Sequence, residues 1–213
     1  SSGLIFRDEQ KLNVFRADFD IRKLLAKVSI KDSNLALGHS RLITNGLADN
    51  QPVVRGGICV IHNGIIVNDE ALWTELKLER NQEIDTEIIA AIAEEYVKET
   101  NQVDGLSKKI LGVCKGVIAT AIVVPKLGKV ILFSNNGSLY LGWKGQDFYF
   151  SSEIYPLKKL GCQDTRQLID DEFIVDIPKR NEIDVKDFKS RANDLIPKFK
   201  YIESERKMLE YPI

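Results

Sequence analysis

The feature that most constrains the fold of this chain is a nearly continuous apolar run at residues 117–124, Val-Ile-Ala-Thr-Ala-Ile-Val-Val. The run is β-branched and far shorter than the roughly 20 residues of a membrane-spanning helix, so it predicts a buried strand. Seven further segments show the alternation or the short apolar runs of strands. They are residues 3–7, 35–39, 57–62, 129–133, 139–143, 148–151 and 172–177. The chain is therefore expected to be rich in strands.

Four other segments predict helices. Apolar residues recur at helical spacing in residues 69–78 and 86–97, and both helices are expected to pack on a sheet. A third helix is expected at 104–114 and a short one at 153–160, with Gly161 as its stop. Strands separated partly by turns and partly by helices predict a layered α+β domain rather than a regular doubly wound sheet.

Length and composition bound the class of protein. The 213 residues suffice for one sizeable α/β domain with a buried core. Thirty basic and thirty-one acidic residues give a net charge of −1, so neither nucleic acid nor a membrane is expected as a partner. The three cysteines are odd in number and lack a C-x-x-C spacing, which argues against a disulfide framework and a zinc site. No metal or cofactor is expected, no signal peptide opens the chain, and a soluble cytoplasmic protein fits best.

The amino-acid composition of the chain changes from about Pro178. Charged residues dominate 179–189, and residues 199–209 have the pattern of an amphipathic helix with little core of its own. Residues 1–178 are therefore interpreted as one domain, and 179–213 as a linker or C-terminal extension.

Three segments carry residues suited to an α-amino acid. They read Gly-His-Ser-Arg-Leu-Ile-Thr-Asn-Gly at 38–46, Ile-His-Asn-Gly-Ile-Ile at 61–66 and Ile-Asp-Thr-Glu-Ile-Ile at 84–89. In order, they supply a fixed cation, an Asn-Gly pair that exposes backbone, and a carboxylate. An α-amino acid needs an arginine fork for its carboxylate and an acid for its ammonium, with N–H donors where a side-chain carbonyl becomes an oxyanion.

Together these segments resemble the glutaminase domain of class II glutamine amidotransferases, the N-terminal-nucleophile type found in glucosamine-6-phosphate synthase and asparagine synthetase. The resemblance extends from Ser1 to about Ile177. It implies a four-layer α/β/β/α sandwich of the N-terminal-nucleophile hydrolase type. It also implies that glutamine is hydrolysed to glutamate and ammonia, and that a synthase domain or subunit receives the ammonia. A homo-oligomer is compatible with this interpretation.

The resemblance assigns roles to individual residues. Arg41 and Thr44 fall on the positions that hold the glutamine carboxylate. Asn63 and Gly64 fall on the oxyanion hole, where the asparagine amide and the glycine N–H face the developing negative oxygen. Asp85 falls on the acid that binds the ammonium of glutamine.

Each of these residues also has a purely structural interpretation. Arg41 taken alone is more often part of a surface salt bridge, and Asn63-Gly64 alone most often marks a tight hairpin turn. Asp85 or Thr86 alone is explained as the N-cap of the helix that follows. The chain has two histidines, His39 and His62. Neither has an evident Asp or Ser partner of a catalytic triad, so both are interpreted as structural.

The nucleophile of this family is a cysteine at the N-terminus, whose own amine acts as the base. Ser1-Ser2-Gly3-Leu4 matches the Ser-Ala-Gly-Leu that opens the family's second strand better than it matches the Cys-Gly-Ile start. The first strand and helix, with the cysteine, are therefore expected upstream of residue 1. The cysteines within the chain occupy positions of structural residues and are not expected to replace it: Cys59, Cys114 and Cys162.

The acceptor of the ammonia stays open between two subfamilies. Residues 201–213 look like the segment that links the glutaminase and isomerase domains of phosphosugar synthases, which makes a phosphosugar the first choice. Leu42 in place of a tryptophan, and Gln51-Pro52 in place of His-Pro, favour an asparagine synthetase-like partner. A third possibility is a non-catalytic module that keeps the amino-acid pocket, or only its fold.

Overall fold

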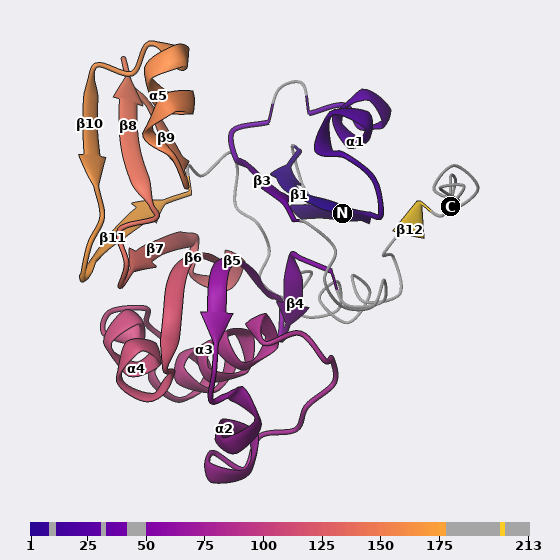
Figure 1. Ribbon diagram of the computed structural model, residues 1–213, viewed down its shortest axis with the longest axis vertical. Coiled ribbons are helices and arrows are strands. Elements are labelled where there is room, and N and C mark those ends of the chain that lie inside the picture. Colours follow the sequence, from indigo (N-terminus) through magenta and orange to yellow (C-terminus); the bar gives the residue numbers. More distant parts are fainter. Residues whose placement is uncertain (9–11, 31–32, 42–49, 178–200, 203–213) are drawn as a thin grey trace, which may run out of the picture. The chain divides into compact units, whose positions relative to one another are not determined.

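The computed structural model describes residues 1–8, 12–30, 33–41, 50–177 and 201–202, and these form two compact units (Figure 1). The N-terminal unit comprises Ser1–Val53 together with Pro178–Ile213. The central unit comprises Val54–Ile177. Both combine helices with antiparallel strands, as expected for an α+β chain.

The N-terminal unit is built on a four-stranded sheet in the order β12-β2-β1-β3. Its elements are β1 (Ser2–Arg7), β2 (Leu12–Ala17), α1 (Ile21–Lys27), β3 (Ala36–Ser40) and β12 (Tyr201–Ile202). β1 is buried along its whole length and pairs antiparallel with both β2 and β3, whereas β12 pairs parallel with β2. A small core of Leu4, Phe6, Ala17 and Leu24 joins α1 to the sheet.

Residues 50–52 are fixed against the first two strands. The Asn50 amide donates to the Ala17 carbonyl at 3.0 Å and to the Ser2 carbonyl at 3.2 Å. The Arg16 Nε donates to the Pro52 carbonyl at 2.7 Å. Gly3 admits no side chain, because a Cβ there would lie 2.1 Å from the Gln51 carbonyl oxygen. The β1 backbone therefore approaches this segment more closely than any other residue type would allow.

The central unit contains a five-stranded sheet in the order β11-β7-β6-β5-β4. Its strands are β4 (Val53–Arg55), β5 (Ile58–Ile66), β6 (Gly116–Val124), β7 (Lys129–Ser134) and β11 (Asp171–Asp176). Its helices are α2 (Asp69–Glu75), α3 (Thr86–Thr100) and α4 (Leu106–Val113), followed later by the short 3-10 helix η1 (Pro125–Leu127). α3 packs on β5, and α2 and α4 pack against α3 (Figure 1). Apolar side chains of both layers are fully buried between them, including Ile88, Ile89, Leu106, Ile110, Ile118 and Ile122.

A second, three-stranded sheet in the central unit has the order β10-β8-β9. It consists of β8 (Tyr140–Lys144), β9 (Asp147–Ser151) and β10 (Asp164–Gln167), with α5 (Ile154–Leu160) alongside (Figure 1). The Trp143 and Phe148 rings lie 5.6 Å and 5.2 Å from the Phe173 ring on β11, so aromatic contacts join the two sheets. Gly161 ends α5 in the left-handed conformation with φ 80°, as the sequence predicted.

All eight predicted strands and four of the five predicted helices are present, with boundaries that shift by up to four residues. Six elements of the described chain were not predicted: β2, β4, β10, β12, α1 and η1. The helix expected at 199–209 is wrong at Tyr201–Ile202, which form β12; residues 203–209 lie outside the described part of the chain. Both are β-formers, and pairing with β2 overrides the weak helical pattern.

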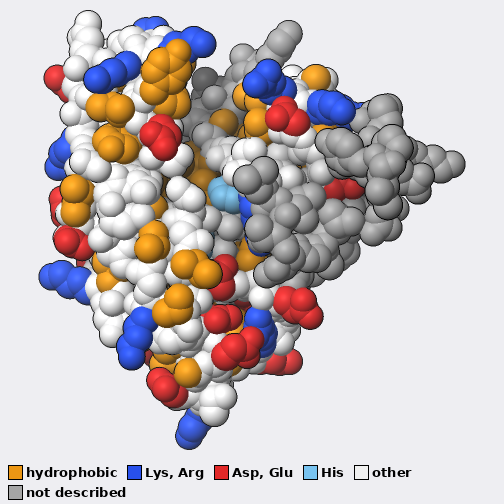
Figure 2. Space-filling view, in the orientation of Figure 1, with side chains coloured by type: hydrophobic (Ala, Val, Ile, Leu, Met, Phe, Trp, Pro, Cys, Tyr) orange, Lys and Arg blue, Asp and Glu red, His pale blue; other side chains and the backbone are white. Residues whose placement is uncertain are grey.

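Two general properties of the described surface bear on partners. Figure 2 shows acidic and basic side chains together over the visible surface of the central unit. Among the described residues, no helix combines the length and hydrophobicity needed to cross a bilayer.

Candidate functional site

Asn63 and Gly64 lie inside strand β5. The strand is buried from Ile58 to His62 and then becomes exposed at Asn63, Gly64 and Ile65. It continues to pair with β6 through this stretch, with Asn63 opposite Ala119 and Gly64 opposite Ile118. The interpretation of Asn63-Gly64 as a hairpin turn is therefore wrong, because the pair sits where a strand emerges from the core.

The backbone at Gly64 requires glycine. Its φ is 147°, and a Cβ there would lie 1.9 Å from the Val117 carbonyl oxygen of β6. Gly116 on β6 is in a similar position, since a Cβ there would lie 2.1 Å from the Ile65 carbonyl oxygen. The two strands thus approach each other closely at this end, and Gly64 is needed for that approach quite apart from any access of a ligand.

The Asn63 side chain is exposed and makes no hydrogen bond with the described residues. Two apolar side chains adjoin it on the paired strands, Ile65 and Val117, which are 58% and 40% exposed and lie opposite each other. Asn63 therefore presents its amide beside apolar surface, where a hydrogen bond to a ligand would be strong once water is displaced.

Asp85 precedes α3 at the N-cap position, but its side chain does not cap that helix. Its φ and ψ are −57° and −28°, and it makes no capping hydrogen bond within the described helix. Its Oδ2 instead accepts a hydrogen bond of 2.9 Å from the Ile66 N–H of β5. Capping therefore does not explain this aspartate. The bond attaches its carboxylate to the same strand that carries Asn63 and Gly64, two residues beyond Gly64.

His62 lies between the sheet and the start of α3. The residue is 2% exposed, and its Nε2 lies 3.1 Å from the Val117 carbonyl oxygen. Its Nδ1 lies 3.5 Å from the Thr86 Oγ1, which is also 3.5 Å from Asp85 Oδ1. Burial lowers the pKa of His62, while the Asp85 charge and the Val117 carbonyl oppose this effect. The expected structural role of His62 agrees with this burial, although the ring has an aspartate nearby that the sequence did not reveal.

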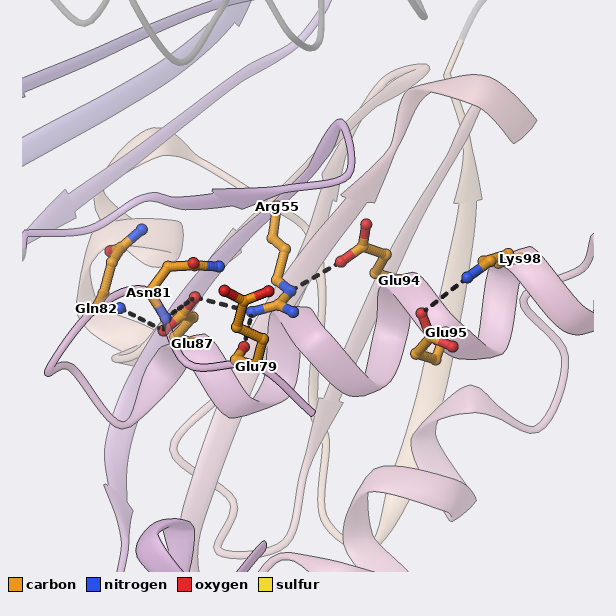
Figure 3. Close-up of polar contacts among 8 residues, drawn as sticks. All are labelled: Arg55, Glu79, Asn81, Gln82, Glu87, Glu94, Glu95 and Lys98. Carbon is orange, nitrogen blue, oxygen red and sulfur yellow. Dashed lines mark hydrogen bonds and ion pairs between the residues drawn. The ribbon is translucent and has the colours of Figure 1, made fainter. Parts of the chain in front are cut away.

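A buried carboxylate fixes the loop that leads from α2 to Asp85 (Figure 3). Glu87, whose side chain is 1% exposed, accepts hydrogen bonds from the Asn81 N–H at 3.0 Å and the Gln82 N–H at 2.7 Å. It also pairs with Arg55 Nη1 at 3.0 Å, and Arg55 Nε pairs with Glu94 at 2.8 Å. These contacts hold the loop against α3 immediately before the aspartate.

Trp73 and Arg80 hold the same loop from its other side. The Arg55 and Arg80 guanidinium groups lie 5.8 Å and 6.0 Å from the Trp73 ring centroid, within the range of cation–π contacts. Arg80 donates to the Gln82 carbonyl at 2.8 Å and the Glu83 carbonyl at 2.6 Å, and it pairs with Glu70. Nothing in the sequence indicated this support, because no pattern of letters links residues that meet only after α2, α3 and β4 have packed.

Arg41 belongs to the N-terminal unit, at the end of β3. Its N–H donates to the Ser1 carbonyl at 3.0 Å, which places it beside the first residue of β1. Thr44 lies outside the described residues. Convergence of Arg41 and Thr44 with Asn63, Gly64 and Asp85 on one pocket therefore stays a prediction.

The three cysteines are free thiols within secondary structure or next to it. Cys59 is buried in β5, Cys114 is buried at the C-cap of α4, and Cys162 follows Gly161 with partial exposure. Burial raises the pKa of the Cys114 thiol to about 12, with smaller contributions from Asp69 and Asp85. Cys114 therefore stays a protonated thiol at neutral pH, which does not suit a nucleophile.

Known proteins have sequences similar to that of this chain. The model of the glutamine amidotransferase domain family matches residues 39–159. The isomerizing glutamine–fructose-6-phosphate aminotransferase of Thermococcus kodakarensis is 28% identical over 165 residues, which cover 72% of this chain and 27% of that protein. The enzyme of the same name from Zymomonas mobilis is 28% identical over 202 residues, covering 90% and 32%. That from Campylobacter jejuni is 30% identical over 168 residues, covering 74% and 28%. The chain thus spans less than a third of the length of these relatives.

Solved structures share the fold. The glutamine phosphoribosylpyrophosphate amidotransferase of B. subtilis superposes with a TM-score of 0.67 and 21% identity, covering 82% of this chain and 40% of that one. A glutamine aminotransferase class-II domain protein from Silicibacter pomeroyi superposes with a TM-score of 0.56 and 15% identity, covering 82% and 86%. These similarities confirm the predicted fold class, an α+β sandwich of the N-terminal-nucleophile type.

Proposed function

Because the chain belongs to the glutamine amidotransferase domain family, we propose that it is the glutaminase part of a class II amidotransferase. Membership of the family confirms the resemblance that the three sequence segments indicated. In this function the chain binds glutamine, and hydrolysis of the side-chain amide yields glutamate and ammonia. A synthase domain or subunit then takes up the ammonia. Residues 1–178 would form the glutaminase domain and 179–213 a linker or extension. A cytoplasmic location and a homo-oligomer belong to the same proposal.

The observation that carries the proposal is the attachment of Asp85 to β5 beside Asn63 and Gly64. One carboxylate oxygen of Asp85 accepts a hydrogen bond from the Ile66 N–H, and the other lies 3.5 Å from the Thr86 hydroxyl. The carboxylate fixed in this way is proposed to bind the ammonium of glutamine. The Asn63 amide and the Gly64 N–H are the proposed donors to the oxygen of the carboxamide as it becomes negative. Arg41 and Thr44 are proposed to hold the α-carboxylate, for which the arginine fork is suited.

The proposed chemistry is nucleophilic. A thiol attacks the carboxamide carbon, the tetrahedral intermediate places its negative oxygen in the oxyanion hole, and ammonia leaves as a thioester forms. Water then hydrolyses the thioester to glutamate. None of Cys59, Cys114 and Cys162 has the free α-amine that acts as the base in this mechanism, and the first two are buried. The proposal therefore places the nucleophile in a segment that precedes residue 1.

A phosphosugar is the acceptor that we favour, because relatives in sequence are named as aminotransferases of fructose 6-phosphate. Two alternatives have their own support. Leu42 and Gln51-Pro52 favour an asparagine synthetase-like partner. A non-catalytic glutamine-binding module would keep Asp85 and Arg41 without the attacking thiol.

The test is a glutaminase assay on the full-length protein that carries this chain. We expect glutamate to form from glutamine, and glucosamine 6-phosphate to form when fructose 6-phosphate is added. Asparagine formed from aspartate and ATP would instead identify the asparagine synthetase-like alternative. Binding of glutamine by calorimetry without hydrolysis would identify the non-catalytic module. Asn63→Ala should reduce hydrolysis by on the order of 10²-fold, as loss of one oxyanion donor does. Gln146→Ala, which removes an exposed amide in the turn between β8 and β9, is the matched control.

A further inference from the structure

His62 packs against the glycine of the proposed oxyanion hole. Its Nε2 lies 3.1 Å from the Val117 carbonyl oxygen. Both atoms limit the space around Gly64. A Cβ on Gly64 would lie 1.9 Å from the Val117 carbonyl oxygen and 2.9 Å from the His62 Nε2. The imidazole and the β6 carbonyl therefore form the surface on which the Gly64 backbone rests.

The contacts of His62 define its tautomer. A carbonyl oxygen only accepts hydrogen bonds, so Nε2 carries the proton and donates to Val117. The neutral ring, which burial favours, then has Nδ1 as an acceptor facing the Thr86 hydroxyl at 3.5 Å. Asp85 lies next to Thr86 and is bonded back to the Ile66 N–H of β5. His62 thus closes a ring of polar contacts among β5, β6 and the first residues of α3.

We infer that His62 is a positioning residue for the oxyanion hole: it fixes the Asn63-Gly64 backbone relative to Asp85 by holding β5 to the Val117 carbonyl and to Thr86. The inference rests on the proposed function. Its physical basis is that oxyanion donors act only within a narrow distance of the developing charge, and a displacement of about 1 Å costs on the order of 10²-fold in rate. Without the Nε2 donor, the Val117 carbonyl loses this partner and the end of β5 loses a link to β6.

Two substitutions of His62 separate this role from mere filling of space. His62→Gln keeps an amide N–H near the position of Nε2, whereas His62→Leu keeps comparable bulk without a donor. In the full-length protein we expect His62→Leu to lower kcat for glutamine hydrolysis by about 10- to 100-fold, with KM changed by less than about 3-fold. His62→Gln should recover most of the lost kcat.

Amide hydrogen exchange supplies a readout that does not depend on catalysis. Peptides covering residues 63–66 should exchange faster in His62→Leu than in the wild type, while His62→Gln protects them. Peptides of α5 should be unaffected and serve as an internal control. If His62→Leu does not fold, His62→Asn replaces it, since its shorter amide does not reach Val117.

Several outcomes would overturn the inference. Equal losses of kcat in His62→Gln and His62→Leu would show that the imidazole ring matters, rather than the hydrogen bond that it donates. A rise in KM with kcat unchanged would place His62 in ground-state binding. If the wild type shows no glutaminase activity, the proposed function fails, yet the exchange experiment still decides the positioning role: unchanged protection of residues 63–66 in the donor-free variant refutes it.

Discussion

Loss of the Glu87 carboxylate should destabilise the central unit, because this buried group holds together the loop that precedes Asp85. Glu87→Ala removes the acceptor of the Asn81 and Gln82 N–H groups and one partner of Arg55. Breaking a buried ion pair from one side typically costs about 3–5 kcal/mol. The lower end applies here, because Arg55 retains Glu94 and the Glu79 carbonyl.

The expected loss is therefore about 3 kcal/mol of unfolding free energy, or roughly 6–12 °C in Tm for a protein of this size. Urea unfolding followed by circular dichroism measures it. Glu87→Gln, which keeps one acceptor oxygen, should lose less. Glu99→Ala is the matched control, because Glu99 is exposed on the same helix and should change stability by no more than about 0.5 kcal/mol. Equal stability of Glu87→Ala and Glu99→Ala would refute the assigned role of the carboxylate.

Four further outcomes are expected. Gly64→Ala should lower glutaminase activity by more than about 10²-fold, because its Cβ would clash with the Val117 carbonyl; full activity would contradict this geometry. Arg41→Lys and Arg41→Ala should weaken glutamine binding by on the order of 2–5 kcal/mol in calorimetry, and unchanged affinity in both would refute the assignment. Cys114, with its pKa near 12, should resist maleimide at pH 8 until urea unfolds the protein, so rapid native labelling would contradict its burial. The pKa of His62 is lowered from its ordinary value of 6.5, so its contribution to stability is complete above about pH 6.5 and is lost as the pH falls toward the folded-state pKa. His62→Gln should flatten this part of the stability curve.

The elements that were predicted correctly are those in which apolar residues recur with a clear strand or helix spacing, or form a continuous run. The apolar run at 117–124 became β6, and the stripe containing Ile88, Ile89 and Ile92 became the buried face of α3. The missed elements lack such a pattern. β2 alternates between buried and partly buried residues, but a buried Arg16 interrupts its apolar face. The Nε of that arginine donates to the Pro52 carbonyl, a partner 36 residues away that local sequence does not indicate.

For the candidate site too, the sequence indicated some features and only the structure explains others. Asn63, Gly64 and Asp85 were identified by the family pattern in which they stand. The physical reasons for two of them came only with the structure, since both depend on contacts across elements. Gly64 is required by the carbonyl of Val117 on the neighbouring strand, and Asp85 is bonded to Ile66 rather than to its own helix. The position of Arg55, which meets Glu87 and Glu94 only in the folded unit, had no signal in the sequence.

Asp85 has a structural contact that differs from the one its position before a helix predicts. An N-cap aspartate ordinarily bonds to the free N–H groups of its own helix, which stabilises that helix by about 1 kcal/mol. The Asp85 side chain makes no such bond within α3, and one of its oxygens accepts a hydrogen bond from the Ile66 N–H of β5 instead. The helix N-terminus still favours a negative charge at this place. A carboxylate bonded to the strand that carries Asn63 and Gly64 fits the proposed role of an acid that binds the ammonium of glutamine, and capping alone does not account for it.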